Sequence, residues 1–376
     1  MKTLQRLCIS CGGTGGHFYP GLAVAREWQK QGGQVRLLIG GKHAVKQHQT
    51  ASDAGIESVI VDALPLSRNP IGLLRFARAL WRGRRQCLEL FREFRPDALL
   101  TMGSYAGVPP YLAARAVKLP LFLHDGNARL GKATLKMSRH AAALALSFPS
   151  PDAARCGCPS VLTGMPLRPE LLAGKTDKAA ALEEINRRWN TSFTPDRFTV
   201  LVFGGSLGAA GINGNCLIPR DFPTDRLQLI HLTGPGKLEP VQKHYDGASF
   251  PHLLLEGSPD IQLFYSAADW IVCRAGGSTV SEIAYFGRYA LLIPYPFATQ
   301  DHQTLNASYL EPTGGAEIVQ ERDLTPDVFL GKLRSLLDDP EGCRRRGEKL
   351  SERAFPDASE RILNLIDERL TEMEKA

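Results

Sequence analysis

The chain has 376 residues, too many for one ordinary hydrophobic core, so we expect two domains. With 43% hydrophobic and 22% charged residues, its composition excludes a disordered or low-complexity protein. The net charge of +6 is only mildly basic and fits an anionic small molecule or an anionic membrane surface as well as a nucleic acid.

The N-terminal apolar run, Leu7–Cys11, is too short for the apolar core of a signal peptide. No stretch approaches the roughly 20 apolar residues of a membrane-spanning helix, so we expect a protein of the cytoplasm. The eight cysteines form no paired metal framework. Cys8 and Cys11 make a CxxC within a predicted buried strand, and Cys156 and Cys158 stand alone, so we expect reduced thiols.

Short apolar runs alternate with helix-length segments along almost the whole chain, as is typical of parallel strands covered on both faces. In the first half the predicted strands are Leu7–Cys11, Val35–Ile39, Ser58–Val61, Ala98–Thr101, Leu121–His124, Ala143–Leu146 and Ser160–Leu162. In the second half they are Thr199–Phe203, Leu227–Leu232, Leu253–Leu255, Trp270–Cys273, Ala290–Ile293 and Glu317–Val319. The repeated pattern predicts an α/β fold with two Rossmann-like, doubly wound domains.

A glycine-rich loop follows the first predicted strand of each half, Gly12–Gly16 in one and Gly204–Gly208 in the other. A loop without side chains lets a ligand approach the backbone, and the helix that follows offers N–H groups and a partial positive charge. One such loop could be a tight turn that binds nothing. Two loops in equivalent positions favour a phosphorylated ligand.

The loops match neither common nucleotide-binding motif. The pattern GxxxxGK[ST] is absent from both. The pattern GxGxxG fails because Phe18 stands where the third glycine belongs, and the second predicted strand ends without the acid that would bind a ribose. A nicotinamide-dependent enzyme is therefore disfavoured.

His17 directly follows the first glycine loop and falls in the first turn of the predicted helix. The helix N-terminus disfavours protonation of the imidazole, so the residue is suited to act as a base. The alternative is a structural histidine, which is the commoner role for a single histidine.

The segment Pro70–Phe94 predicts one long helix with two stripes. One is apolar except at Arg84 and is predicted to face the core: Leu73, Ala77, Leu80, Arg84, Cys87, Phe91 and Phe94. The neighbouring stripe alternates bulky apolar residues with arginine: Leu74, Arg78, Trp81, Arg85, Leu88 and Arg92. With eight arginines against two acids between Arg68 and Arg95, it suits the headgroup boundary of an anionic bilayer. The alternative is a solvated helix whose arginine stems cover apolar neighbours, broken in two at Gly83.

The segment from Thr163 to Pro169 is rich in glycine and proline and is the predicted hinge. We therefore assign residues 1–164 to an N-terminal domain and residues 165–354 to a C-terminal domain. In proteins of this architecture the ligand lies at the carboxyl ends of the strands, in the crevice between the domains.

The densest motif follows the predicted strand Trp270–Cys273 and reads RAGGSTVSE. Gly277, Ser278 and Thr279 supply N–H groups and hydroxyls suited to a pyrophosphate, and Glu282 can accept both hydroxyls of a ribose. Alternatively, Ser281 and Glu282 only cap the helix. The polar run from Gln300 to Ala307 can contact sugar hydroxyls or simply begin a solvated helix.

Four motifs in this order, GGTGGHFYPGLAVA, GGSLGA, RAGGSTVSEIAYFG and DHQTLNA, carry a family resemblance over nearly the whole chain. The chain resembles the bacterial undecaprenyl-diphospho-muramoyl-pentapeptide N-acetylglucosaminyltransferases. The resemblance implies a GT-B fold, two Rossmann-like domains facing each other across a cleft. It also implies a C-terminal helix, at about residues 355–376, that returns to the first domain.

The resemblance further implies a division of the site residues. The acceptor side comprises Thr14, Gly15, Gly16, His17 and Asn127, with Arg168 at the hinge. The UDP-GlcNAc side comprises Gly205, Ser206, Gly277, Ser278 and Thr279 at the diphosphate, Glu282 at the ribose, and His302 or Gln303 at the sugar.

Two positions depart from the family pattern. The family has His-Glu-Gln-Asn where this chain has His124-Asp125-Gly126-Asn127, so the glutamine contact is lost. The family hinge begins Gly-Asn-Pro, and here it reads Gly164-Met165-Pro166. Both departures concern acceptor and hinge contacts.

The implied reaction moves GlcNAc with inversion from UDP to the 4-hydroxyl of the muramoyl sugar of the undecaprenyl-linked pentapeptide. His17 is the candidate base and Asp125 the weaker one. No DxD metal motif occurs at the predicted site and no metal ligands are assigned, although Mg²⁺ bound loosely with UDP stays open.

The implied partners are UDP-GlcNAc, the lipid acceptor and an anionic membrane surface, without nucleic acid; cell-wall assembly proteins stay open. The implied location is peripheral, on the cytoplasmic face of the inner membrane. Two alternatives remain: a glycosyltransferase of the same fold with another lipid acceptor, and a non-catalytic component of a cell-wall complex.

Overall fold

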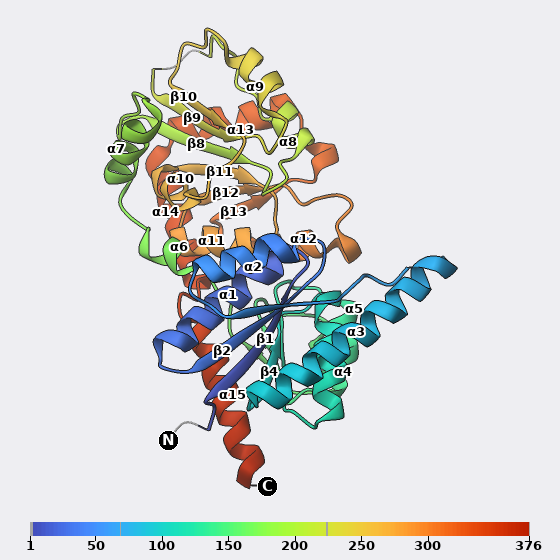
Figure 1. The fold of residues 1–376 in the computed structure, drawn as a ribbon. Helices are drawn as coiled ribbons and strands as arrows, with labels where there is room; N and C mark the ends of the chain where they lie inside the picture. The colour runs from blue at the N-terminus through green and yellow to red at the C-terminus, as the bar shows by residue number, and fades with distance from the viewer. Residues whose placement is uncertain (1–2, 68, 223–224, 376) are drawn as a thin grey trace. The chain divides into compact units, whose positions relative to one another are not determined.

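The computed structural model describes residues 3–67, 69–222 and 225–375 and divides into two compact units (Figure 1). The first unit comprises Met1–Arg168 and Phe355–Ala376, and the second comprises Pro169–Ala354. The boundary follows Arg168 rather than Gly164 because residues 164–167 are buried in the first unit. There a Cβ on Gly164 would lie 2.2 Å from Cβ of Phe355.

The sheet of the first unit has seven parallel strands among the described residues, in the order β3-β2-β1-β4-β5-β6-β7. They are β1 Arg6–Gly12, β2 Gln34–Gly40, β3 Ser58–Val61, β4 Ala98–Thr101, β5 Leu121–Asp125, β6 Ala143–Leu146 and β7 Ser160–Leu162. Each strand lies within one residue of its predicted bounds, because continuous apolar runs mark strands buried on both faces.

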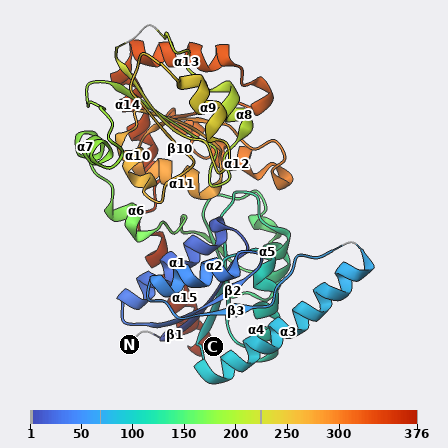
Figure 2. The ribbon, with the colours of Figure 1, turned by 45° about the horizontal axis from the view of Figure 1, so that its top comes forward.

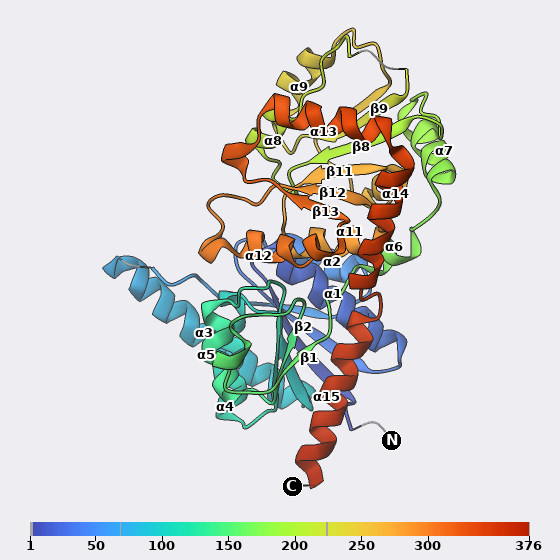
Figure 3. The same ribbon diagram turned by 180° about the vertical axis from the view of Figure 1, so that it is seen from behind.

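Helices cover both faces of this sheet: α1 Gly15–Lys30, α2 Ala44–Asp53, α3 Pro70–Phe94, α4 Val108–Ala116, α5 Lys132–Met137 and α15 Ala358–Lys375. On one face, Ile362 and Ile366 of α15 join the apolar cluster of α1 and α2, and Figure 3 shows α15 running along the sheet. On the other face, Cys87 and Phe91 of α3 pack with α4 and α5. The C-terminal helix is therefore part of the first unit's core.

Helix α3 has its predicted bounds. Its N-cap residue is Asn69, whose side chain accepts a hydrogen bond from Gly72 N, and its C-cap residue is Arg95, in the left-handed conformation. Gly83 does not break it; this residue is buried, and a Cβ there would lie 2.1 Å from the Asp62 carbonyl oxygen.

The predicted core stripe of α3 is wrong in its first half. Leu73 is 50% exposed, and Ala77 and Arg84 are exposed as well. The buried residues are instead Ala79, Gly83, Cys87, Leu90, Phe91 and Phe94. The reason is visible in Figures 1 and 2: the N-terminal half of α3 extends past the sheet, where no element of the first unit covers it.

The second unit has a six-stranded parallel sheet among the described residues, in the order β10-β9-β8-β11-β12-β13. Its strands are β8 Phe198–Phe203, β9 Leu227–Leu232, β10 His252–Leu255, β11 Trp270–Cys273, β12 Tyr289–Leu292 and β13 Ala316–Ile318. Both sheets therefore begin at a central strand, β1 or β8, and grow outward in both directions. This is the doubly wound topology that the sequence predicts.

The helices of the second unit are α6 Pro169–Ala173, α7 Lys178–Trp189, α8 Ala210–Asn215, α9 Leu238–Tyr245, α10 Ile261–Ala267, α11 Gly277–Phe286, α12 His302–Ser308, α13 Pro326–Asp338 and α14 Pro340–Glu348. Ile212, Val241 and Phe329 place α8, α9 and α13 in one apolar cluster with β8. On the opposite face of β8, Tyr265 of α10 contacts the Phe203 ring.

Short 3-10 helices complete the two units: η1 Tyr105–Gly107, η2 Ser138–His140, η3 Ala153–Arg155, η4 Thr299–Asp301, η5 Glu311–Thr313, η6 Glu321–Asp323 and η7 Lys349–Arg353.

Candidate active site

The predicted site residues gather at the carboxyl edge of each sheet. Because all strands of a sheet are parallel, the loops that follow them share one edge. We call residues 12–17, 102–104, 125–131 and 163–168 the first-unit loops. We call residues 204–208, 233–236, 274–276 and 294–303 the second-unit loops.

The first glycine loop has a shape that only glycine allows. Gly12 and Gly13 have φ values of 115° and 83°, and a Cβ on Gly12 would lie 2.4 Å from the Gly40 carbonyl oxygen. The loop presents Thr14, Gly15 and Gly16 as exposed residues at the start of α1. His17 N and Phe18 N already donate to Thr14 O, but the amides of Gly15 and Gly16 come before any acceptor in the helix, so this end of α1 can bind a polar or anionic group.

His17 lies at the rim of this loop. Its side chain is partly exposed, and Nδ1 is 2.8 Å from Oγ1 of Thr14, which acts as N-cap residue of α1. This hydrogen bond fixes the orientation of the imidazole one turn from the glycines. A histidine held in one orientation beside a loop that can bind a ligand is able to exchange a proton with a hydroxyl group of that ligand.

Asp125 is an anchor rather than an open carboxylate. It is 6% exposed and accepts hydrogen bonds from Asn127 N at 3.2 Å, Gly131 N at 3.0 Å and Oγ1 of Thr134 at 2.7 Å. Both oxygens of Asp125 are engaged by these donors, so its carboxylate holds the loop together. The geometry thus favours His17 over Asp125 as the group that removes a proton.

A second buried carboxylate, Asp152, holds the same loop. It accepts from Leu130 N at 3.2 Å and from Nη1 of Arg129 at 3.3 Å and of Arg155 at 2.9 Å. Asn127 is therefore presented by a loop that is fixed before any ligand arrives. The sequence motifs contain no signal for this role of Asp152.

His124 lies below the loop in the core. Its Nε2 is 2.9 Å from the Ser147 hydroxyl, and burial lowers its pKa to about 3. It is therefore neutral at physiological pH and serves as a packed, hydrogen-bonded residue.

Arg168 reaches the first-unit loops from the hinge. Its guanidinium lies 5.3 Å from the centre of the Tyr19 ring. That ring in turn lies 3.5 Å from the place of a Cβ on Gly15. The guanidinium of Arg168 therefore lies beside the first turn of α1, where it is suited to pair with a diphosphate.

The second-unit loops begin with two glycine segments packed against each other. Gly205 and Gly208 have positive φ, and a Cβ on Gly208 would lie 2.1 Å from the Thr233 carbonyl oxygen. The facing segment carries Gly234, also with positive φ, which was not among the predicted site residues although Gly-Pro-Gly is a turn signal. Ser206 is exposed at the tip.

Helix α11 supplies the next group of polar residues. Gly277, Ser278 and Thr279 form its first turn after the N-cap residue Gly276. One turn later, Glu282 accepts a hydrogen bond from the buried Tyr265 hydroxyl through Oε2, at 2.8 Å. Tyr265 orients this carboxylate, and sequence analysis missed it because it comes from another helix.

Arg274 pins the loop that leads to α12. Its Nη1 donates to the carbonyl oxygens of Ile293 and Pro294, both at 3.2 Å, and its Nη2 lies 2.6 Å from Oε2 of Glu321. Tyr295 stacks over the guanidinium at 5.4 Å. Although Arg274 begins the densest motif, its role as a clamp on this loop was not predicted.

The clamped loop carries the two predicted sugar contacts. Gln303 accepts from Tyr295 N at 2.9 Å, which leaves its amide nitrogen as the group suited to a sugar oxygen. His302 bonds through Nδ1 to the Thr299 carbonyl oxygen at 2.9 Å. Asn306, a buried residue that sequence analysis did not assign, donates to Ala275 O and ties α12 to the loop before α11.

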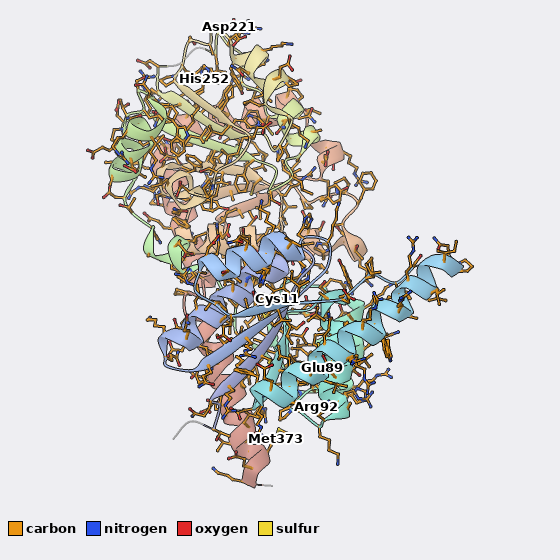
Figure 4. All side chains as sticks on the ribbon, in the orientation of Figure 1. Cys11, Glu89, Arg92, Asp221, His252 and Met373 are labelled. Atoms are coloured by element: carbon orange, nitrogen blue, oxygen red, sulfur yellow. The ribbon has the colours of Figure 1, made fainter. Side chains whose placement is uncertain are left out.

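The predicted acceptor residues thus share the first-unit loops, and the predicted donor residues share the second-unit loops and the start of α11 and α12. Among the described residues, no three histidines, cysteines or acids form a cluster that could hold a metal ion. The CxxC is not a metal pair, because Cys8 and Cys11 pack on opposite faces of the sheet (Figure 4 labels Cys11).

The exposed half of α3 and the loop before it form a mixed apolar and basic surface, which we call the α3 patch: Leu66, Ile71, Leu74, Arg78, Trp81 and Arg85. Leu74 is 72% and Trp81 61% exposed. The acids lie toward the other end of α3, where Glu89, labelled in Figure 4, pairs with Nε of Arg85 at 2.9 Å. Arg68, also predicted for this surface, lies outside the described residues. No described helix combines the length and apolarity needed to cross a bilayer.

Both halves of the chain match models of one known family. Residues 7–146 match the glycosyltransferase family 28 N-terminal domain, and residues 199–362 match the C-terminal domain of the same family. The UDP-N-acetylglucosamine–N-acetylmuramyl-(pentapeptide) pyrophosphoryl-undecaprenol N-acetylglucosamine transferase of Pelobacter propionicus is 33% identical, over 98% of this chain and 99% of that protein.

Two solved structures extend the comparison. The crystal structure of MurG from Acinetobacter baumannii has a TM-score of 0.75 and 27% identity and covers 97% of this chain and 99% of its own. UDP-GlcNAc 2-epimerase from Neisseria meningitidis has a TM-score of 0.69 at 14% identity, covering 98% and 100%, and so shares the fold alone.

Proposed function

The chain belongs to glycosyltransferase family 28, and from that premise we propose that it transfers GlcNAc from UDP-GlcNAc to the 4-hydroxyl of the muramoyl sugar in the undecaprenyl-linked pentapeptide intermediate of peptidoglycan. The observation that carries the proposal is the pairing of two site halves in one chain. One half has a histidine-bearing glycine loop, and the other has an oriented carboxylate beside a helix N-terminus.

The second-unit loops bind the donor. The amides and hydroxyls of Ser206, Ser278 and Thr279 take the diphosphate, and Glu282, oriented by Tyr265, takes the ribose hydroxyls. Gln303 and His302 contact the GlcNAc. As the bond from C1 to the UDP oxygen breaks, negative charge grows on the diphosphate, and the fixed N–H groups stabilise it.

The first-unit loops bind and activate the acceptor. We assign His17 the tautomer in which Nδ1–H donates to Oγ1 of Thr14, so that Nε2 is the basic nitrogen that removes the proton from the 4-hydroxyl. The freed oxygen attacks C1 of GlcNAc from the face opposite UDP, through an oxocarbenium-like transition state, so the configuration inverts. Asn127 and Arg168 orient the acceptor.

We assign leaving-group stabilisation to the N–H groups and hydroxyls at the start of α11 and on the loop of Ser206. Mg²⁺ that arrives with UDP would bind the diphosphate oxygens directly. Turnover measured after chelation of Mg²⁺ distinguishes stabilisation by protein groups from stabilisation by the metal.

The α3 patch brings the first unit to the lipid. Exposed Trp81 and Leu74 suit the boundary between headgroups and acyl chains, and Arg78 and Arg85 suit anionic headgroups. The protein is thereby peripheral on the cytoplasmic face of the membrane, where UDP-GlcNAc and the lipid acceptor meet.

The test is UDP release by the purified protein with a soluble, short-chain analogue of the muramoyl-pentapeptide lipid, comparing UDP-GlcNAc, UDP-GalNAc and UDP-glucose. We expect release with UDP-GlcNAc only when the analogue is present. If the protein bound UDP but released none from UDP-GlcNAc in the presence of the analogue, the assignment of the donor site would stand and the assignment of the acceptor would be wrong.

A further inference from the structure

The second unit contains a polar cavity that the proposed reaction does not use. It has a volume of about 220 Å³ and is lined by residues of α13, α14 and strands β11, β12 and β13. Trp270 and Tyr289, the first residues of β11 and β12, form part of its wall. Because these strands end at Cys273 and Leu292, just before the second-unit loops, the cavity lies toward the opposite edge of the sheet from those loops.

The charged groups of the cavity form one network around Glu317 of β13. One of its carboxylate oxygens accepts from the Tyr289 hydroxyl, and the other pairs with Nζ of Lys332. Although burial opposes ionisation, these two donors lower the pKa of Glu317. Arg346 lies over the Tyr289 ring at 4.4 Å and donates from Nη1 to the hydroxyl at 3.3 Å. Both oxygens of the only carboxylate among the described lining residues are therefore engaged by protein donors.

The polar side-chain groups that remain are hydrogen-bond donors. Nε and Nη1 of Arg346 donate to a carbonyl and a hydroxyl of the protein, but no described residue accepts from Nη2. Lys332 spends one of its three N–H groups on Glu317, and the exposed Ser335 hydroxyl bonds to no described residue. Two cations against one carboxylate give the lining an excess of one positive charge. The cavity is therefore suited to an anion.

The arrangement of these donors favours phosphate over a carboxylate. The guanidinium comes from α14, and the ammonium and the hydroxyl come from α13, one turn apart on that helix. Donors that approach one cavity from two helices can each bind a different oxygen of a tetrahedral phosphate, whereas a carboxylate offers only two oxygens in one plane.

We propose that this cavity is a second anion site, separate from the donor loops, which binds a phosphate ion or a small phosphate monoester through Arg346, Lys332 and Ser335. The site goes beyond the transfer reaction proposed above and does not depend on it.

Gly331 on α13 allows the cavity to be closed with little effect on the fold. It is exposed, it lines the cavity, and no atom lies within 4 Å of its Cβ position. Its φ is not positive, and it lies inside a helix, where glycine is less favourable than any residue except proline. Side chains introduced at this position therefore change the cavity rather than the backbone.

The experiment is calorimetric titration with inorganic phosphate and with glycerol 3-phosphate. The protein is first saturated with UDP, so that the donor loops are occupied. We expect G331E, which adds a negative charge at the cavity, to weaken binding of both probes about 30-fold, and the neutral G331Q about threefold. R346Q, which removes the guanidinium, should weaken binding about tenfold. The tighter of the two probes identifies the ligand as free phosphate or as an ester.

The matched control is R345Q, since Arg345 is the exposed neighbour of Arg346, pairs with Glu341 at 3.5 Å and does not line the cavity. It should bind both probes like the wild type. Acetate should bind the wild type at least about tenfold more weakly than phosphate, because it offers fewer acceptor oxygens. Acetate binding as tight as that of phosphate would overturn the assignment to phosphate.

Two results would overturn the site itself: a wild type that binds neither probe, or a G331E variant that binds them as tightly as the wild type. Thermal unfolding of each variant without probe verifies that it is folded. If the wild type fails to bind UDP, the proposed function fails, but the comparison of G331E with G331Q still tests the cavity.

Discussion

The two units share one topology and differ in what they place at the carboxyl edge. Each sheet begins at its central strand, followed by a glycine loop and a helix. In the first unit the loop leads into the 16-residue α1 with His17 in its first turn. In the second unit it leads into the six-residue α8, and polar contacts come instead from α11 and α12.

Under the proposed function, this difference in polar residues lets one fold bind an acceptor in the first unit and a nucleotide sugar in the second. The first unit fixes a loop with two buried carboxylates, Asp125 and Asp152, and carries His17, the proposed base. In the second unit, Arg274 fixes the loop before α12, and Tyr265 orients Glu282, the proposed ribose contact. The following predictions test whether these roles are separate.

The largest effect is expected from H17A. Loss of the base should lower kcat about 10³-fold, while KM for UDP-GlcNAc stays unchanged because the donor is held by the other unit. Steady-state UDP release measures both constants. T14V, which removes only the hydroxyl that orients the ring, is the control and should lose about tenfold. Near-normal turnover of H17A would rule it out as the base.

The next effect concerns the α3 patch. Reversing Arg78 and Arg85 to glutamate together with W81A should weaken binding to anionic vesicles roughly 100-fold, by loss of charge attraction and of an apolar anchor. Vesicle flotation measures it. R344E/R345E, at two exposed arginines on α14 of the second unit, is the control for charge reversal and should float like the wild type. Unchanged flotation of the α3 variant would place membrane contact elsewhere.

E282Q should act on the donor alone. Replacing a charged acceptor of the ribose hydroxyls should raise KM for UDP-GlcNAc about 30-fold, with acceptor KM unchanged. Calorimetric titration with UDP gives the same loss without turnover. Y265F, which removes only the orienting hydroxyl, should lose about fivefold. A larger change in acceptor KM than in donor KM would contradict the proposal that the second unit binds the donor and the first unit binds the acceptor.

Each unit also contains one buried histidine, and here the comparison predicts similar behaviour. Burial lowers the pKa of His124 and of His231 from 6.5 to about 3 in the folded state. Between these values the unfolded state binds more protons, so the unfolding free energy falls as pH drops from 6.5 toward 3, by at most about 1.4 kcal/mol per pH unit for each histidine.

Thermal unfolding at pH 7 and pH 5 measures this loss. Both units should unfold at lower temperature at pH 5. A shift confined to one unit would show that the other histidine is not held neutral.

The smallest effect is expected from chelation. Because the proposal places N–H groups and hydroxyls at the diphosphate, turnover in excess EDTA should stay close to that in Mg²⁺. Loss of activity that added Mg²⁺ restores would show that a metal carried with UDP stabilises the leaving group.

How far the sequence predicts this fold depends on whether a signal is local. The buried strands, such as Ala98–Thr101, appear with their predicted bounds because continuous apolar runs carry the signal themselves. The core stripe of α3 was wrong because periodicity cannot tell where the sheet ends, so Leu73 was assigned to a core that does not reach it.

The site divides in the same way. The glycine loops and the residues of the densest motif lie at the strand ends because local backbone chemistry places them there. Tyr265 and Asp152 act on site residues far away in sequence, through contacts that only tertiary packing creates. No motif spacing could have identified them.

The central claim is most directly tested by identifying the product. The protein is incubated with UDP-GlcNAc and the soluble acceptor analogue, and the product is analysed by mass spectrometry and NMR. We predict a disaccharide with GlcNAc joined through a β-linkage to the 4-hydroxyl of the muramoyl sugar. Conversion of UDP-GlcNAc to its C2 epimer without any disaccharide, the chemistry named for the Neisseria neighbour of the same fold, would contradict the account.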